Sequence, residues 1–329
     1  LLAKGEKIVK AKLDKLLRFS GNDKHIMVYN ETFLDLMSDG HMPQEARQKM
    51  TEQYMGYDQL HQNVGSLFHN PDTTSWLCCE QMEPLAEEIT GKAVNFDPLT
   101  IFSCISFPRP MDEGLQRHSL NVALLNAMQA EWLGLKGAEI KVYTLAGLLH
   151  DIGKTMIPEE ILFAPRKLTQ DEVMIMREHP VYSDSLLSKK FCEDIRLAAR
   201  HHHEKLDGTG YPDGISGEQI SVIARVTAIS DIYDAMVSAR SYKDSRLPLH
   251  VLNMFYDGEF EGLDRRLVML FIKNMRQKYT DHEVVMSDGM KATIRYIPPN
   301  DAAHPVVQRD GVIRQSDGEW YCKEMVTSF

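Results

Sequence analysis

The sequence predicts a mainly α-helical protein: a helical bundle between an N-terminal mixed or helical domain and a small C-terminal β appendage. Three observations predict this arrangement. Apolar residues repeat at helical spacing between positions 118 and 241, short alternating runs follow position 281, and prolines cluster at 95–110. We therefore expect three domains, covering residues 1–105, 106–280 and 281–329.

The composition limits the class of protein. Of 329 residues, 43% are apolar and 26% charged, which is enough to bury a core and excludes disorder as the dominant state. The net charge of −10 disfavours binding to a nucleic-acid polymer or a membrane surface. We expect no membrane span, because no run of 18 apolar residues occurs, and no signal peptide, because no charged stretch followed by an apolar one opens the chain.

The cysteines and the first residue bear on the cellular context. Five cysteines, an odd number, argue against a disulfide framework and favour a cytoplasmic protein. Because the chain begins at Leu1 and not at Met, we expect it to be a segment of something longer.

The first domain gives few signals. An amphipathic helix is predicted over 10–18, and a short strand over 25–29 after the turn-forming Gly21-Asn22-Asp23. The histidines of this region have no catalytic spacing, and we expect them to be surface or packing residues: His25, His41, His61 and His69.

The first two helices of the bundle are marked by apolar periodicity and glycine ends. The first helix stops at Gly134, and its apolar positions are Leu120, Leu124, Leu125 and Met128. The second is predicted over 140–152, with Gly153 at its C-terminal end.

The later helices of the bundle carry start signals. Pro158 suits the first turn of a short helix, and Thr169 with Glu172 forms a capping-box signature for the next one. Helices over 193–203 and 221–238 complete the bundle.

The tail changes from helical to alternating periodicity. Turn signals are Asp288-Gly289, Asp310-Gly311 and Asp317-Gly318. The short strands predicted around these turns are 284–286, 292–297, 306–309, 312–315 and 320–323.

Histidines gather in the bundle region at intervals that allow successive helices to bring one each to a common point: His118, His150, His179, His201, His202 and His203. Imidazole together with carboxylate suits a first-row divalent metal. His150-Asp151 follows an apolar run, and a buried carboxylate there needs a partner, of which a metal is the simplest. A carboxylate can also span two ions, an arrangement that hydrolyses phosphate esters, and Lys154 could offset charge on a phosphate.

A second pairing, His202-His203, lies at the end of its helix, where we expect His201 to be the outward member of the three. The following stretch 208–214 contains three glycines and a proline, which forbid a helix and predict a shaped loop. Tyr211 at its centre can pack on a base or donate a hydrogen bond. An ordinary connector is the alternative interpretation of this loop.

Three motifs in order, His150-Asp151-Ile152-Gly153-Lys154, His202-His203-Glu204 and Gly210-Tyr211-Pro212, resemble those of the HD-GYP family. This family is a branch of the HD-domain metal-dependent phosphohydrolases, and its members hydrolyse the bacterial messenger cyclic di-GMP. The resemblance covers about residues 113–245 and implies an HD-type helical bundle with a binuclear metal centre.

Position by position, the resemblance implies seven metal ligands, with Asp151 bridging two ions: His118, His150, Asp151, His179, His202, His203 and Asp231. Asp151 and Lys154 are expected to be catalytic, and Asp234 to be structural. The resemblance also implies four substrate contacts: Lys154, Tyr211, Arg240 and Lys243.

The chain departs from the family at two places. Some members bind a third metal through a Glu four residues before the first histidine, where this chain has Gly114, with Glu113 one step away, so two metals are expected. Ser241 replaces the proline of the family's Arg-Pro-Tyr, which leaves the loop that carries Lys243 less constrained.

The leading hypothesis is a phosphodiesterase that hydrolyses cyclic di-GMP to linear pGpG, with GMP as a further product, by a metal-bridging hydroxide. Iron is the metal most expected, manganese next, and zinc stays open. Two alternatives stay open: an HD phosphohydrolase acting on another nucleotide, and a weakly active or inactive cyclic di-GMP-binding scaffold, which Gly114 and Ser241 favour. Partner proteins in cyclic di-GMP signalling fit either hypothesis, and residues 1–105 would be regulatory. The sequence does not indicate the oligomeric state.

Overall fold

The computed structural model describes residues 52, 55–65, 79–95, 114–187, 190–238 and 247–325, all of which lie in one compact unit, Met50–Thr327. The predicted helix over 10–18 and strand over 25–29 lie outside the described residues. The predicted boundary near residue 105 also lies outside them, so the division into three domains stays a prediction.

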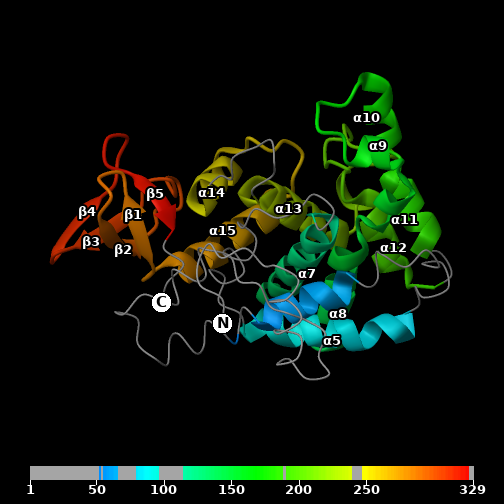
Figure 1. The fold of residues 1–329 in the computed structure, drawn as a ribbon, viewed down its shortest axis with the longest axis horizontal. Helices are drawn as coiled ribbons and strands as arrows, with labels where there is room; N and C mark the ends of the chain where they lie inside the picture. Colours follow the sequence, from blue (N-terminus) through cyan, green and yellow to red (C-terminus); the bar gives the residue numbers. More distant parts are fainter. Residues whose placement is uncertain are drawn as a thin grey trace, which may run out of the picture. The chain divides into compact units, whose positions relative to one another are not determined.

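A central helix, α7 (Gly114–Trp132), organises the bundle (Figure 1). It packs against three helices: α5 (Cys79–Asn95), α8 (Ala138–Leu149) and α13 (Val222–Val237). Every residue from Gln116 to Ala130 is buried, so α7 is covered on all sides and not along a single apolar stripe.

Polar side chains inside α7 satisfy one another across the helix interfaces. The Asn126 amide donates to Thr227 Oγ1 at 2.9 Å, and the Gln129 amide donates to Ser230 Oγ at 2.7 Å. Buried amides without such partners would cost free energy, so these bonds fix the register of α7 against α13.

The other helices follow in chain order. Helix α11 packs against η2 and α12, and α12 packs against α8 and α13. The bounds are η2 (Ile152–Met156), α9 (Glu159–Leu162), α10 (Gln170–Met176), α11 (His179–Leu187), α12 (Glu193–His201), η3 (Gly217–Gln219), α14 (Pro248–Asp257) and α15 (Arg265–Tyr279). The sequence pattern did not identify α14 and α15.

The structure confirms the capping box of α10, in which Thr169 accepts from the Glu172 backbone and Glu172 accepts from the Thr169 backbone. The predicted end of the second helix is wrong. The helix stops at Leu149, and Gly153 lies in the 3-10 helix η2. A Cβ on Gly153 would lie 2.1 Å from the His179 carbonyl oxygen, so glycine is required there by the close approach of α11.

Five antiparallel strands form a sheet in the order β4-β3-β2-β1-β5. Their bounds are β1 (Glu283–Met286), β2 (Lys291–Tyr296), β3 (Val306–Arg309), β4 (Val312–Gln315) and β5 (Cys322–Met325). Asp310 and Gly311 both have positive φ, at 50° and 79°, as a two-residue hairpin between β3 and β4 requires. The predicted β appendage is confirmed.

Among the described helices, none combines the length and the apolar character needed to cross a bilayer.

The close packing of α8 on α7 yields a stability prediction. A Cβ on Gly147 would lie 2.7 Å from the Val122 carbonyl oxygen and 2.8 Å from Ala123 Cα, both backbone atoms that cannot move aside cheaply. Gly147→Ala should therefore lower the free energy of unfolding by about 2 kcal/mol or more, measured by urea denaturation.

Gly91→Ala is the matched control for this substitution. Gly91 lies within α5, and a Cβ there meets nothing within 4 Å. Replacing glycine inside a helix should then stabilise the protein by about 0.5–1 kcal/mol. Equal effects of the two substitutions would contradict the proposed packing of α8 on α7.

Candidate metal centre

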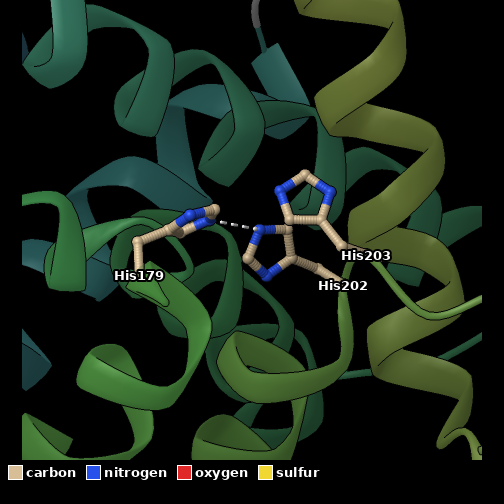
Figure 2. Close-up of side chains that lie close together, drawn as sticks. All are labelled: His179, His202 and His203. Carbon is tan, nitrogen blue, oxygen red and sulfur yellow. Dashed lines mark hydrogen bonds between the residues drawn. The ribbon is translucent and has the colours of Figure 1, made fainter. Parts of the chain in front are cut away.

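Two groups of potential metal ligands lie in the bundle, each with its ligand atoms within 4.8 Å of one another. One contains His118, His150 and Asp151, and the other contains His179, His202 and His203. Figure 2 shows His179 reaching toward His202 and His203 from a separate segment of the chain. Five elements or their ends therefore contribute: α7, the end of α8, the start of α11, the end of α12 and, through Asp231, α13.

The histidines at helix ends are held in one tautomer by backbone carbonyls. His150, His179 and His202 each donate from Nδ1 to the carbonyl three residues earlier, at 2.7, 2.7 and 2.8 Å. Those carbonyls lie in the last turns of α8, α10 and α12, where carbonyl groups have no partner within the helix. Because a carbonyl oxygen can only accept, the proton must be on Nδ1, which leaves a lone pair on Nε2.

His118 lies within α7, where no free backbone carbonyl is available to its Nδ1, so a carboxylate side chain accepts the hydrogen bond instead. Its Nδ1 donates to Asp234 Oδ2 at 2.7 Å, so its Nε2 also points into the centre. Metal-binding histidines commonly use their second nitrogen in this way. Asp234, which the sequence assigned a structural role, supports His118 directly.

The nitrogen atoms that face inward are spaced as ligands of shared ions would be. His118 Nε2 lies 3.2 Å from His150 Nε2, and His179 Nε2 lies 3.4 Å from His202 Nε2. Two nitrogens bound to one ion at about 2.1 Å lie roughly 3.0–3.4 Å apart. Lone pairs that face each other at this distance in a buried site repel unless a cation lies between them, so the donor set fits divalent metal.

Asp151 spans the two groups with its two oxygens. Its Oδ2 lies 3.5 Å from His118 Nε2 and 3.3 Å from His150 Nε2, whereas its Oδ1 lies 3.1 Å from His179 Nε2. Because His179 uses its proton elsewhere, Oδ1 is buried with no hydrogen-bond partner among the described residues. A buried, unsatisfied carboxylate oxygen directed at imidazole lone pairs fits a carboxylate that bridges two ions.

Asp231 on α13 also faces both groups. Its Oδ1 lies 3.1 Å from His118 Nε2, and its Oδ2 lies 3.9 Å from His203 Nδ1. Both carboxylates therefore lie close to the nitrogen atoms and add negative charge to a site that three helix C-termini already make favourable for cations.

The pKa values follow the distribution of charge. Burial would raise the pKa of Asp151, but His150 and Lys154 hold it well below its usual value. Burial lowers the pKa of His202 well below its usual value, with His203 adding to the effect, and lowers that of His203 to about 3. These two histidines are therefore neutral and available as ligands.

His118 differs from the other histidines. Burial lowers its pKa, but the hydrogen bonds and the negative charges of Asp231 and Asp234 outweigh burial and raise it to about 9. The protein alone therefore favours a positive charge at this point, which either a proton or a metal ion can provide.

One side of the centre is open to solvent. His150 and His202 are fully enclosed, whereas the side chains of Lys154, His203 and Asp231 are 23%, 25% and 15% exposed. The Lys154 ammonium contacts Asp151 Oδ2 from this side. A ligand would approach the centre past these three residues.

The glycine-rich loop is attached to the end of α12 and brings Tyr211 to the open side. The Tyr211 ring stacks on His203, with centroids 4.7 Å apart, and its backbone N–H donates to the His203 carbonyl. A Cβ on Gly210 would lie 2.4 Å from Glu204 Cα, so only glycine allows the loop to come this close. Glu204 Oε1 accepts from the backbone N–H of Asp213 at 2.6 Å, which holds the far end of the loop.

The structure brings together all seven predicted ligands with Lys154 and Tyr211. Arg240 and Lys243 lie outside the described residues. His201 lies in neither ligand group and contacts Asp213 at 2.9 Å, but it is buried, and His203 is the most exposed of the three histidines. Sequence reasoning missed Arg177, whose guanidinium lies 5.0 Å from the Tyr211 ring centroid. No periodicity or motif marks it, because the contact depends on the course of the glycine-rich loop.

Comparison with known proteins identifies an HD domain in the central part of the chain. Residues 111–256 match the HD domain family. The chain is 45% identical over 151 residues to the "Cyclic di-GMP phosphodiesterase response regulator RpfG" of Xanthomonas campestris pv. campestris, covering 45% of this chain and 40% of that protein. It is 30% identical over 232 residues to "3'3'-cGAMP-specific phosphodiesterase 1" of Vibrio cholerae, covering 70% of this chain and 51% of that protein.

A solved structure supports the fold. Bd1817, a HDG"Y"P protein from Bdellovibrio bacteriovorus, superimposes with a TM-score of 0.54 at 16% identity, covering 74% of this chain and 77% of that one. The chain spans about half or less of the length of the two curated relatives, at 40% and 51%.

The fold and the histidine–aspartate arrangement define an HD domain over the matched residues. The His-Asp, His-His-Glu and Gly-Tyr-Pro motifs, which resemble those of the HD-GYP family, meet at one site of this domain.

The buried donor set predicts that divalent metal stabilises the folded protein. Adding Mn²⁺ to metal-free protein at about 100 times its Kd should raise the free energy of unfolding by about 2.7 kcal/mol, seen as a higher Tm in calorimetry. His202→Ala should reduce this rise, because it removes a neutral, enclosed ligand.

His304→Ala serves as the control for that measurement. His304 follows β2 and contacts Asp301 at 2.7 Å, outside both ligand groups. Its variant should keep the full metal-dependent rise in Tm. An unchanged rise in the His202 variant would count against the metal centre.

Proposed function

We propose that this protein is a metal-dependent phosphodiesterase that hydrolyses cyclic di-GMP to linear pGpG, with GMP as a further product. One observation carries the proposal: four imidazole Nε2 lone pairs and the unsatisfied Asp151 Oδ1 face one buried point beside an open side. The curated relatives are named as phosphodiesterases of cyclic dinucleotides, which supports this substrate class.

The proposed roles follow from the contacts. His118 and His150 would hold one ion, His179, His202 and His203 the other, and Asp151 and Asp231 would span both. When bound, the ions supply Lewis-acid activation of water and offset the negative charge of the phosphate. Iron suits this nitrogen-rich set best, manganese next, and zinc stays open.

The chain's own cations and aromatic ring would bind the substrate on the open side. Lys154, whose ammonium contacts Asp151 Oδ2 on the open side, would offset the charge of a phosphate oxygen. Tyr211, fixed on His203, offers a ring edge and a hydroxyl, and Arg177 adds a guanidinium next to it. Burial, together with the charges of Asp151 and Asp231, raises the pKa of Tyr211, so its hydroxyl stays protonated and can donate a hydrogen bond. Arg240 and Lys243 complete the proposed substrate contacts.

A second candidate substrate is 3'3'-cGAMP, because one relative is named as specific for it. The inactive binding module is the remaining alternative, and it differs from the enzyme in an observable way. Such a module would bind cyclic di-GMP tightly, with metal loaded, and release no product.

Asp151→Asn tests the proposed reaction. The substitution keeps the shape of the side chain but replaces one of its two anionic oxygens by a donor, so one carboxylate bridge is lost. We expect at least about a 100-fold loss of kcat, together with a lower metal content, because even supporting residues of metal sites change affinity 10–100-fold. The measurements are product chromatography with cyclic di-GMP and with 3'3'-cGAMP, and elemental analysis of protein purified without oxygen.

Asp184→Asn is the matched control on α11, since this aspartate pairs with Arg196 at 2.8 Å and not with a candidate ligand. It should retain activity and metal. Full activity with two ions in the Asp151 variant would sink the assignment. Tight binding of cyclic di-GMP without product in the metal-loaded wild type would select the binding module.

Arg177→Ala tests the missed cation. Because the exposed Arg177 guanidinium lies over the Tyr211 ring and contacts no candidate metal ligand, its loss should raise KM for the cyclic dinucleotide about 3–30-fold with little change in kcat. Steady-state kinetics give both constants.

Arg166→Ala is the control, because the Arg166 guanidinium is already paired with Glu172 at 2.7 Å. Its KM should be unchanged. An equal rise in both variants would indicate a general effect of positive charge and not a contact of Arg177 with substrate.

A further inference from the structure

A chain of buried hydrogen bonds leads from residues 55–65 to the metal centre. The Tyr57 hydroxyl donates to Asn121 Oδ1 at 2.6 Å, and Asn121 Nδ2 donates to Asp234 Oδ1 at 2.7 Å. Asp234 Oδ2 then accepts from His118 Nδ1 at 2.7 Å. Tyr57, Asn121 and Asp234 are each no more than 1% exposed, so water does not compete for these bonds.

The direction of every bond in this chain is fixed. Asp234 is a carboxylate and can only accept, so both His118 Nδ1 and the Asn121 NH₂ group must donate to it. With its nitrogen turned to Asp234, Asn121 presents its oxygen to Tyr57, whose hydroxyl must therefore donate. The asparagine cannot rotate without breaking a bond at both ends.

Helical spacing places these groups one behind the other. His118 and Asn121 are three residues apart on α7, and Asp231 and Asp234 are three apart on α13. The first member of each pair faces the metal centre. The second members, Asn121 and Asp234, bond to each other one turn away, and Asp234 also accepts from His118. Tyr57 completes this arrangement from a third helical segment.

Packing holds residues 55–65 in the position from which the Tyr57 hydroxyl reaches Asn121. Tyr57, Leu60 and Val64 are buried at helical spacing, and Lys92 of α5 donates to the Gly56 carbonyl oxygen at 3.0 Å. The segment also lies ahead of the matched HD domain, which begins at residue 111. The chain therefore contributes to its metal centre a contact from outside that domain.

We propose that Tyr57 is a positioning residue for the metal ligand His118, acting through Asn121 and Asp234. This inference rests on the proposed metal centre. His118 needs such support more than the other ligands, because it lies inside a helix and has no free carbonyl to fix its ring. Without the hydroxyl, Asn121 Oδ1 loses a buried donor, so the amide shifts and Asp234 no longer holds the imidazole in one orientation.

Only one of the two ions should depend on this chain. His118 belongs to the group with His150 and Asp151, whereas His179, His202 and His203 are oriented by carbonyls or neighbours elsewhere. A loss of general stability would weaken both ions alike. A loss of positioning would weaken the ion of the His118 group selectively.

The test is titration of the metal-free chain with Mn²⁺ alone, by calorimetry with a competing chelator. Tyr57→Phe should weaken one of the two Mn²⁺ sites about 3–10-fold and leave the other unchanged, since direct supporting partners of metal ligands contribute 10–100-fold and Tyr57 acts two bonds further out. With Co²⁺ in place of Mn²⁺, the visible absorption of the weakened site should shift.

Tyr279→Phe is the matched control, because it removes the buried hydrogen bond between the Tyr279 and Tyr233 hydroxyls at 2.8 Å and touches no candidate ligand. It should leave both Mn²⁺ sites intact, although its Tm without metal falls as much as that of the Tyr57 variant. Equal Mn²⁺ binding by wild type and Tyr57→Phe, or equal weakening of both sites, would overturn the inference. Failure of the wild type itself to bind Mn²⁺ would overturn the proposed metal centre instead.

Discussion

The mutual repulsion of inward-facing lone pairs is the constraint on which the site depends. Imidazole nitrogens 3.2 and 3.4 Å apart lie beside two carboxylates in a buried position. Such an arrangement is stable only with positive charge at its centre. The bundle must therefore be rigid enough to keep these groups together, and α7, enclosed on every side, is held to α13 by the side chains of Asn126 and Gln129.

Three of the histidine rings are oriented by backbone carbonyls at the ends of helices. His150, His179 and His202 each follow a helical turn whose last carbonyls have no backbone partner, and each ring takes one of these carbonyls. The three rings thus gain a fixed tautomer from their own neighbourhood. His118 cannot do so in the middle of α7, and its support comes from Asp234, Asn121 and Tyr57 on separate segments. The candidate metal centre thereby combines three histidines oriented by local contacts with one, His118, that is oriented by distant segments.

The open side of the centre also depends on a segment at the end of a helix, the glycine-rich loop that follows α12. The glycine-rich loop returns to His203 through a backbone bond and a stacked Tyr211, and Glu204 accepts backbone N–H groups at the loop's far end. Because the loop is tied to the segment that carries two ligands, the position of Tyr211 depends on the centre itself. Arg177 approaches from the end of α10, which also supplies the carbonyl that orients His179, so the open side and the candidate ligands share a supporting element.

The sequence by itself determined the helical class, the β tail and the capping box at Thr169, because helical period and turn residues are local properties. Its resemblance to the HD-GYP family implied the seven groups that the structure brings together. The sequence did not predict α14 or α15. It also placed the end of α8 too late: the helix stops at Leu149, and Gly153 lies against α11 instead. Only the tertiary structure decided which oxygen of Asp151 faces which group, that Arg177 lies against Tyr211, and that Tyr57 supports His118. These contacts join residues that are distant in the chain, so local sequence preferences do not predict them.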